Sequence, residues 1–525
     1  MSIRGAAVAW GLASLCLIVP LVFIGVEAAS AGGVVATLVD PELHRLLLNT
    51  LALAATVTVF ACVLGFPLGI LLGGYSFPLN RAIALLAAVP LLIPHHVQTI
   101  GWMRVFGRQG WMTEALASLG VTLDVRAAAF PGFWPGPAWI MALALFPLVA
   151  LPVAAAVTRL DRDAIASATL AGGSSAALRV AVIPAGFTAL PGAASLVFAL
   201  ASGAYAVPSL LDTPVLVQRV FFTFSQRSQG EGALLVLPLL VSAALAAALL
   251  GDPWFRSGAM GGAGRTTRER VGWLGTAIAR FPVLCGVIVP IGALIAKIVE
   301  EALRNPSAPS PFKVVFSRTA ASFGNGLIFA MLATVVVLLT AWPLARHFAA
   351  RQGAISERLL TASIALPPLV LGVGTILAWK HVSNVPLLDA IYRSGLILLV
   401  LGLAGRFLPI VVRDLRDGLL ALDPSAEEAA RVAGASGMRR TWGVVIPMMR
   451  SSIIACIVIA FTLAITELDL TLLLYPPGME TVQVRIFNMV HYARDAEVSA
   501  LCLMAVAFAA LPVSFYALLR RRKGT

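Results

Sequence analysis

Apolar residues recur along this chain in twelve long runs, separated by short polar segments. Each run holds roughly 20 or more mostly apolar residues, the length that a helix needs to span a bilayer. The pattern therefore predicts an all-α polytopic membrane protein with about twelve transmembrane helices. The runs are 6–27, 46–74, 82–105, 138–158, 186–211, 232–250, 276–299, 322–345, 359–380, 394–413, 451–475 and 497–519.

Composition agrees with the runs, because 59% of the 525 residues are hydrophobic and only 12% are charged. A soluble domain carries roughly 25% charged residues. The net charge of +13 does not indicate a nucleic-acid binder, since the basic residues are spread through short gaps and form no basic domain. None of the four lysines follows a glycine, which excludes a Walker A loop and hence an ATPase within this chain.

Basic residues also predict the orientation of the spans. With the N-terminus inside, the inner segments hold 23 of the 38 basic and 10 of the 25 acidic residues, so they carry the whole surplus of 13. We therefore expect a multi-pass protein of a bacterial inner membrane, surrounded by lipid, with both termini in the cytoplasm. Residues 6–27 could be read as a cleaved signal peptide, but 276–299 is an equivalent run that cannot be cleaved, so we expect the first run to be retained.

The two halves of the chain resemble each other. Residues 160–172 align without gaps on residues 422–434 at an offset of 262, and Pro147 matches Pro409 at the same offset. Further upstream, Asn49 matches Asn325 and Pro67 matches Pro343 at an offset of 276. This repeat predicts two parallel six-helix units, 1–251 and 275–525, joined by a cytoplasmic linker at 252–274.

One segment, 422–447, is predicted to form a helix-turn-helix in the cytoplasm. Asp423 and Pro424 suit a helix start, and Ser425 with Glu428 offers an alternative capping box. Gly434 suits a helix end or bend, after which a second short helix at about 437–445 leads to a proline. Such a shape suits insertion into a cleft of another protein, although the residues alone equally allow an ordinary amphipathic loop.

The spacing in this segment resembles the EAA loop of ABC importer permeases: Glu428-Ala429-Ala430, three residues, Gly434, nine residues, then Val444 to Pro447. The fused two-unit layout and residues 203–211 resemble the iron(III), thiamine and polyamine permeases. The resemblance implies a non-enzymatic subunit whose loops dock on a cytoplasmic ABC ATPase dimer, which alone holds ATP and Mg²⁺, while this chain holds no cofactor. It also implies a periplasmic or extracellular substrate-binding protein, received by outer loops 106–137 and 476–496.

By this resemblance, Glu428 would pair with a basic group on the ATPase, the alanines would allow close approach and Gly434 would allow the bend. The expected coupling residues of the second loop are Asp423, Glu427, Glu428, Ala429, Ala430, Gly434 and Pro447. Those of the first loop are Asp161, Asp163, Gly172 and Pro184. Because residues 166–168 read Ala-Ser-Ala in place of Glu-Ala-Ala, we expect two unequal docking sites.

Charged residues inside a span are costly and so mark functional candidates. Glu467 and Asp469 lie in the eleventh run, and on a helix they would point about 200° apart, so we do not expect both to line one narrow path. Glu467 serves either the path or a structural pairing with Arg406 of the tenth run. The aligned region of the first half holds Tyr205, which predicts an asymmetric path.

His95 and His96 follow Pro94, and with Pro90 they suggest a broken helix of the kind that lines transporter cavities. Adjacent histidines face apart, so we expect no metal site; the pair serves transport, gating or packing. Acidic path groups would suit a cation such as iron(III), a polyamine or thiamine, while a phosphonate also falls within the resemblance. The alternative function is a secondary transporter driven by an ion gradient.

Overall fold

The computed structural model describes residues 3–107, 110–120, 135–226, 229–256, 269–351, 353, 355–381, 385–386, 389 and 395–521. Within these ranges, nine helices are long and apolar enough to cross a membrane. Three bent helix pairs, Asn80–Leu91 with His95–Ser118, Ile355–Ala365 with Pro368–His381 and Gly437–Met448 with Arg450–Thr466, raise the number to as many as twelve. The predicted all-α polytopic fold is therefore confirmed.

Within the described residues, the α-helices and the strand of the first half run from the N-terminus to the linker. They are α1 (Ile3–Ala13), α2 (Val19–Ser30), α3 (Val34–Val39), α4 (Pro41–Gly74), β1 (Tyr75–Ser76), α5 (Asn80–Ala88), α6 (His95–Phe106), α7 (Trp111–Ser118), α9 (Pro135–Leu145), α10 (Pro147–Thr158), α11 (Arg162–Ala177), α12 (Ile183–Ser202), α13 (Ala206–Leu210), α14 (Leu216–Gln226) and α15 (Gln229–Arg256).

The second half follows a similar order after the linker, of which residues 257–268 lie outside the described residues. Its elements are β2 (Glu269–Arg270), α16 (Trp273–Val283), α17 (Val289–Arg304), α18 (Pro311–Ala350), α19 (Ile355–Ala362), α20 (Pro368–His381), α22 (Leu396–Leu420), α23 (Pro424–Val432), α24 (Gly437–Arg440), α25 (Ile446–Met448), α26 (Arg450–Thr466), α27 (Thr471–Leu474), α28 (Val482–Met489) and α29 (Asp495–Arg521). The two strands, which the sequence patterns do not predict, pair in parallel through Tyr75 and Glu269.

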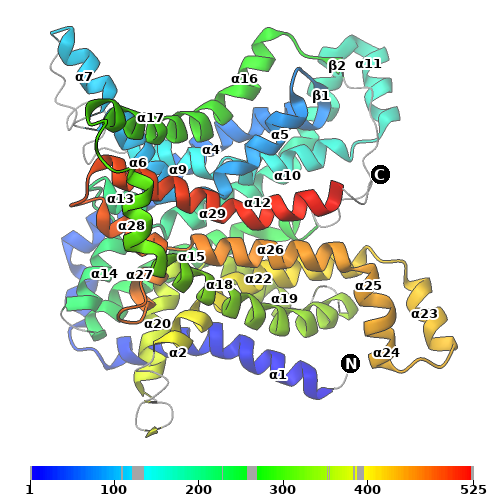
Figure 1. Ribbon diagram of the computed structural model, residues 1–525. Helices are drawn as coiled ribbons and strands as arrows, with labels where there is room; N and C mark the ends of the chain where they lie inside the picture. Colours follow the sequence, from blue (N-terminus) through cyan, green and yellow to red (C-terminus); the bar gives the residue numbers. More distant parts are fainter. Residues whose placement is uncertain are drawn as a thin grey trace.

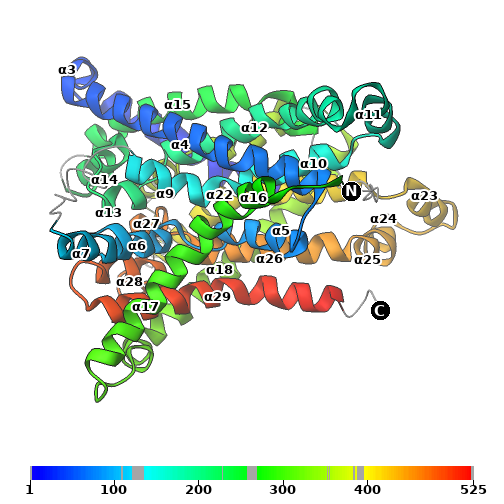
Figure 2. The ribbon, with the colours of Figure 1, turned by 90° about the horizontal axis from the view of Figure 1, so that it is seen from above.

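The helix bundle has two distinct ends. Both chain termini lie at the same end as α11 and α23–α25, whereas α7, α14 and α28 lie at the opposite end (Figures 1 and 2). We call these the loop end and the far end. The two loops with the repeated sequence thus emerge on one side of the bundle, as an even number of spans between them requires.

Equivalent contacts recur in the two halves. Helix α4 packs along α10, and α18 packs along α22. The Asn49 side-chain amide donates a hydrogen bond to the carbonyl of Pro214 at 3.1 Å, and the equivalent Asn325 donates to the carbonyl of Glu480, also at 3.1 Å. Matched hydrogen bonds are expected in a duplicated fold, because the asparagine amide needs a hydrogen-bond partner in each half.

The first span of each half packs against the other half. Helix α2 contacts α20, and α17 contacts α6. A Cβ atom added at Gly374 would lie 2.5 Å from the carbonyl oxygen of Pro20, and one at Gly101 would lie 2.7 Å from that of Pro290. Only glycine permits these approaches. The two halves are therefore packed closely together, although the predicted linker at 252–274 divides them in the sequence.

Candidate translocation path and coupling loops

The eleventh predicted span is interrupted at Glu467. Helix α26 ends at Thr466, and Glu467 takes an extended conformation with φ −71° and ψ 127°. The fifth predicted span breaks at the equivalent place, since α12 ends at Ser202 and α13 begins at Ala206. The predicted spans 451–475 and 186–211 are therefore wrong at their far ends, because apolar length alone does not reveal where a helix stops.

This break places Glu467 and Asp469 together. Both residues line one cavity of about 110 Å³, which His95 and His96 also line. Both residues line this small cavity because the segment is not helical here, so the rotation of 100° per residue does not apply. The larger cavity described below is lined by Glu467 and not by Asp469, so the expectation that the two do not share one path stays a prediction.

Asp469 connects the two halves of the chain at this cavity. One carboxylate oxygen accepts a hydrogen bond from the backbone N–H of Tyr205 at 3.0 Å, and the other accepts one from the N–H of Ala206 at 3.2 Å. Bonds from N–H groups to a carboxylate are stronger than those between neutral groups. Asp469 therefore acts as a clamp on the first residues of α13.

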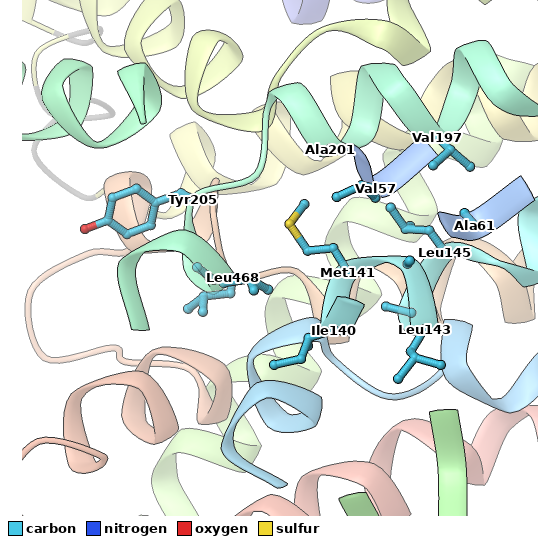
Figure 3. Close-up of a cluster of buried hydrophobic side chains, with 14 of the residues drawn as sticks. Val57, Ala61, Ile140, Met141, Leu143, Leu145, Val197, Ala201, Tyr205 and Leu468 are labelled. Carbon is cyan, nitrogen blue, oxygen red and sulfur yellow. The ribbon is translucent and has the colours of Figure 1, made fainter. Parts of the chain in front are cut away.

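Tyr205 enters this clamp through its backbone. Its side chain is buried, does not line this cavity, and packs on Phe221 and Phe487 with ring centroids 4.8 and 6.0 Å away. Tyr205 belongs to the same buried apolar cluster as Met141 of the first half and Leu468 of the second half (Figure 3). Tyr205 is therefore a packing residue at the junction of the two halves.

Arg406 does not form an ion pair with Glu467, although both residues lie near the same break. Within the described residues, its Nη1 donates to the carbonyl oxygens of Ile364 at 3.1 Å and Leu366 at 2.6 Å. These carbonyls lie where α19 and α20 are broken, so the guanidinium satisfies backbone groups that a continuous helix would bond internally. Glu467 instead accepts a hydrogen bond from the N–H of Leu470 at 3.1 Å.

The two histidines occupy different positions at the predicted break. Helix α5 is followed by a bend of 103°, after which α6 begins at His95. His95 lines both the small cavity and a larger one, whereas the side chain of His96 is buried and its Nε2 has no hydrogen-bond partner within the described residues. Among those residues, no group of three or more metal-ligating side chains is found.

The larger cavity has a volume of about 1400 Å³ and lies between the halves. It extends from Arg406 and Glu467 at the break toward the loop end, where Arg159 and Arg413 line it. Its walls come from α10 and α12 of the first half and from α22 and α26 of the second. An internal space of this size can hold a hydrated ion or a small organic molecule.

At the loop end, the second repeated loop, residues 423–447, has the predicted helix-turn-helix form. Asp423 is the N-cap of α23, and its Oδ1 accepts the N–H of Ser425 at 2.9 Å. Hydrogen bonds from Ser425 hold the pKa of the Asp423 carboxyl below its usual range. Gly434 has φ +79°, and the N–H of Ala435 donates to the carbonyl of Ala430 at 3.0 Å, which closes a Schellman motif.

The two glutamates of this loop have different surroundings. Glu427 forms an ion pair with Arg346 of α18 at 2.9 Å, and the same guanidinium donates to Thr441 at 2.6 Å. Glu428 is exposed and, within the described residues, makes no hydrogen bond or ion pair. Glu427 therefore anchors the loop to the bundle, while Glu428 is available to a partner. Ala429 is exposed and Ala430 half-buried.

The first loop keeps this form with other residues. Asp161 caps α11 by accepting the N–H of Asp163 at 3.1 Å, and Asp163 is exposed. The chain bends at Gly172, with φ −164°, and Gly173, with φ +74°. The left-handed residue of the first loop is therefore Gly173, one position after Gly172, which the repeat aligns with Gly434. Pro184 and Pro447 both follow a single π-helical turn.

Large apolar side chains are exposed on both loops, and sequence reasoning missed them. Leu170 is 90% exposed and Val432 is 85% exposed, and these two positions are related by the repeat offset of 262. Met438 and Trp442 are also exposed on the second loop. The sequence could have revealed this surface, because an apolar residue stands just before the Ala-Gly pair of each loop. Exposed apolar residues that recur in a repeat indicate a contact surface.

Comparisons with known proteins agree with this arrangement. Residues 337–524 match the family described as binding-protein-dependent transport system inner membrane component. A probable ABC transporter permease protein, y4fN, of Sinorhizobium fredii is 26% identical over 84% of this chain and 81% of its own length. The Fe(3+)-transport system permease protein FbpB 2 of Haemophilus influenzae is 24% identical over 96% of both chains.

A probable sulfate transport system permease protein, cysT, of Nephroselmis olivacea is 31% identical over 38% of this chain and 72% of its own length. The match to FbpB 2 runs through both halves, whereas the family match lies within the second half. With its membrane-spanning helices, this chain therefore belongs to the family of binding-protein-dependent inner membrane components, the permease subunits of ABC transporters.

Proposed function

We propose that this chain forms the translocation path of an ATP-driven importer and that α11 and α23 couple it to a pair of cytoplasmic ATPase subunits. The observation that carries this proposal is the pair of repeated loops at one end of the bundle, each with a cap, a left-handed glycine and an exposed apolar residue. An ATPase dimer presents two similar clefts, so two similar loops on one face match it in number and symmetry.

The contacts support a rigid connection between the second loop and the membrane helices. The Arg346–Glu427 ion pair joins α23 to α18, and α18 packs along α22, which lines the large cavity. A displacement of α23 would thus be passed to a cavity wall without crossing a flexible segment. The first loop has Ile165 at the position of Glu427, so its connection lacks that ion pair.

In this function the ATPase partner holds ATP and Mg²⁺, and a substrate-binding protein delivers the cargo at the far end, which then faces the cell exterior. Both termini are then cytoplasmic. We propose a small cation such as iron(III) as the cargo, with a polyamine, thiamine or phosphonate as the other candidates. The full-length similarity to a permease named for Fe(3+) transport supports the first of these.

The test reverses the charge at Glu428, because this side chain is exposed and has no hydrogen-bond or ion-pair partner among the described residues. Permease carrying Glu428→Arg is reconstituted with its ATPase subunits, and the affinity of the ATPase for the permease is measured. We expect a loss of about tenfold or more, equivalent to about 1.4 kcal/mol. Ala166→Arg, at the equivalent position of the first loop, is expected to have a smaller effect.

Glu114→Arg is the matched control, since Glu114 is an exposed glutamate on α7 at the far end. It should leave ATPase binding unchanged. Unchanged binding by both Glu428→Arg and Ala166→Arg would contradict the assignment of these loops as the coupling elements.

A further inference from the structure

The first span of each half changes its helical form at one matched place. Residues Ser14–Ile18 and Leu284–Ile288 each form a single π-helical turn, and the two turns are related by an offset of 270. A proline stands two residues after each turn, Pro20 in the first half and Pro290 in the second. Single π-helical turns are rare and occur frequently at functional sites. Their recurrence makes the π-turn with its proline a feature of the repeat.

The carbonyl that each proline leaves without a helical donor faces the opposite half. Proline has no N–H, so the carbonyl four residues earlier loses its α-helical hydrogen bond. In the second half this carbonyl belongs to Gly286, and it accepts a bond from the side-chain amide of Gln98 of α6 at 2.9 Å. In the first half it belongs to Cys16, and a Cβ atom added at Gly405 of α22 would lie 2.5 Å from its oxygen. Each span therefore bends at a lower cost here than in a regular helix.

Each π-turn divides its span into two parts with different neighbours. On the loop-end side, α1 packs on α18, and α16 packs on α4 and α5, which belong to the opposite half in each case. On the far-end side, α2 packs on α20 of the opposite half and on α15 of its own, and α17 packs in the same way on α6 and α29. A relative motion of the halves would carry α1 and α16 with the opposite half, while both halves hold α2 and α17.

We propose that the two π-turns are hinges at which the first spans bend when the halves move against each other. Sharp bends in helices occur at prolines and π-turns, and both are present at each of these places. The hinge lies where the contacts change from one half to both, so each span bends without leaving the surfaces on which it packs. This inference rests on the proposed function in one respect, that the halves move during the ATPase cycle.

The test removes one residue from a turn, because a π-turn holds one residue more than an α-helical turn. The N–H of Val289 donates to the carbonyl of Leu284, five residues earlier. Deletion of Ile288, whose side chain is exposed, converts this pair into an α-helical bond and keeps the flanking helices in register. Ile288→Ala is the matched control, since it removes the side chain and keeps the turn. Deletion of Ile295, exposed on α17, is the control for a shifted register.

Distances between spin labels report the motion in the complex of the chain with its ATPase subunits. The five native cysteines are replaced by alanine, and labels are attached at exposed positions after substitution by cysteine. Leu85 of α5 with Leu518 of α29 joins the two halves, and Leu85 with Ile278 of α16 joins the first span to the opposite half. In the cysteine-free parent, we expect MgATP with vanadate to change the first distance and to leave the second unchanged.

Deletion of Ile288 should lower the population with the changed distance about fivefold, because bending would then break one helical hydrogen bond. Pro290→Ala should lower it less, since the new N–H competes with Gln98 for the carbonyl of Gly286. Ile288→Ala should leave it unchanged. The Ile288 deletion should keep the thermal unfolding midpoint of the parent, whereas the Ile295 deletion should lower it.

A full distance change after deletion of Ile288 would overturn the hinge proposal and leave the proposed function standing. If this deletion lowers the midpoint as much as the Ile295 deletion does, Pro290→Ala decides: an unchanged population would overturn the hinge, and a reduced one would support it. A first distance that does not change in the parent would contradict the motion of the halves and, with it, the proposed function.

Discussion

Replacement of Gly434 by alanine isolates the backbone contribution of the turn that ends α23. Gly434 has φ +79°, and no atom lies within 4 Å of where its Cβ would be. The substitution therefore creates no clash, and its effect must come from the left-handed conformation. Gly437→Ala is the matched control, because Gly437 starts α24 without a positive φ and its nearest neighbour to an added Cβ is Arg440 at 3.9 Å.

The expected magnitude follows from backbone energetics. A left-handed conformation costs a residue with a Cβ atom about 1–2 kcal/mol. At the lower figure, the equilibrium for opening the turn shifts about fivefold toward the open form. Asparagine tolerates this conformation better than alanine, so Gly434→Asn should cost less. The hydrogen bond from Ala435 to Ala430 depends on the same turn and is lost when it opens.

Hydrogen exchange of residues 433–436, followed by mass spectrometry on the purified protein, measures this opening directly. We expect exchange about five times faster with Gly434→Ala, a smaller increase with Gly434→Asn and no increase with Gly437→Ala. Gly434→Asp separates geometry from charge, since aspartate also tolerates the left-handed region but adds a negative charge at the docking surface. We expect it to uncouple ATP hydrolysis from uptake more than Gly434→Asn does.

Equal exchange in the Gly434→Ala variant and the parent would refute the reasoning, because the cost of the left-handed backbone would then be absent. Loss of coupling in Gly434→Asn as severe as in Gly434→Asp would show that size at this position, rather than charge, limits docking.

Two further predictions concern the junction between the halves. Asp469→Asn should lower the thermal unfolding midpoint of the purified chain, because the amide can accept only one of the two N–H groups of Tyr205 and Ala206, and a charged hydrogen bond contributes about 1.5–3 kcal/mol; an unchanged midpoint would contradict the clamp. Gly374→Ala should also lower the midpoint, by an overpacking cost of about 1–3 kcal/mol against Pro20, whereas Gly292→Ala, in open space on α17, should not; equal midpoints for the two variants would disprove the close approach.

Local sequence predicted the structure of the second repeated loop well. Its cap, its left-handed glycine and its second basic helix depend on contacts between residues a few positions apart, so Asp423, Gly434 and the segment after Ser436 could be read in order. The loop's attachment could not be read in this way. The partner of Glu427 is Arg346, which is 81 residues distant, and no local pattern relates the two.

The candidate path shows the same division. The sequence identified Glu467, Asp469, Arg406 and both histidines, because charged and polar residues inside apolar runs are conspicuous. It could not place them, since their geometry depends on where α26 stops, and that stop is stabilised by hydrogen bonds to Leu470 and, across the halves, to Tyr205 and Ala206. Asp414, which lines the larger cavity, was overlooked because it lies one residue beyond the predicted tenth run, and α22 continues to Leu420.

By itself, the sequence determined that this chain is a duplicated, all-helical membrane protein with repeated loops on one side, because hydrophobic length and the repeat offset are properties of the chain alone. Only the tertiary structure decided that the first span of each half packs on the other, that Glu467 and Asp469 face one small cavity, and that a larger cavity lies between the halves. Those features arise from close packing and hydrogen bonds between residues far apart in the chain, which a one-dimensional pattern does not record.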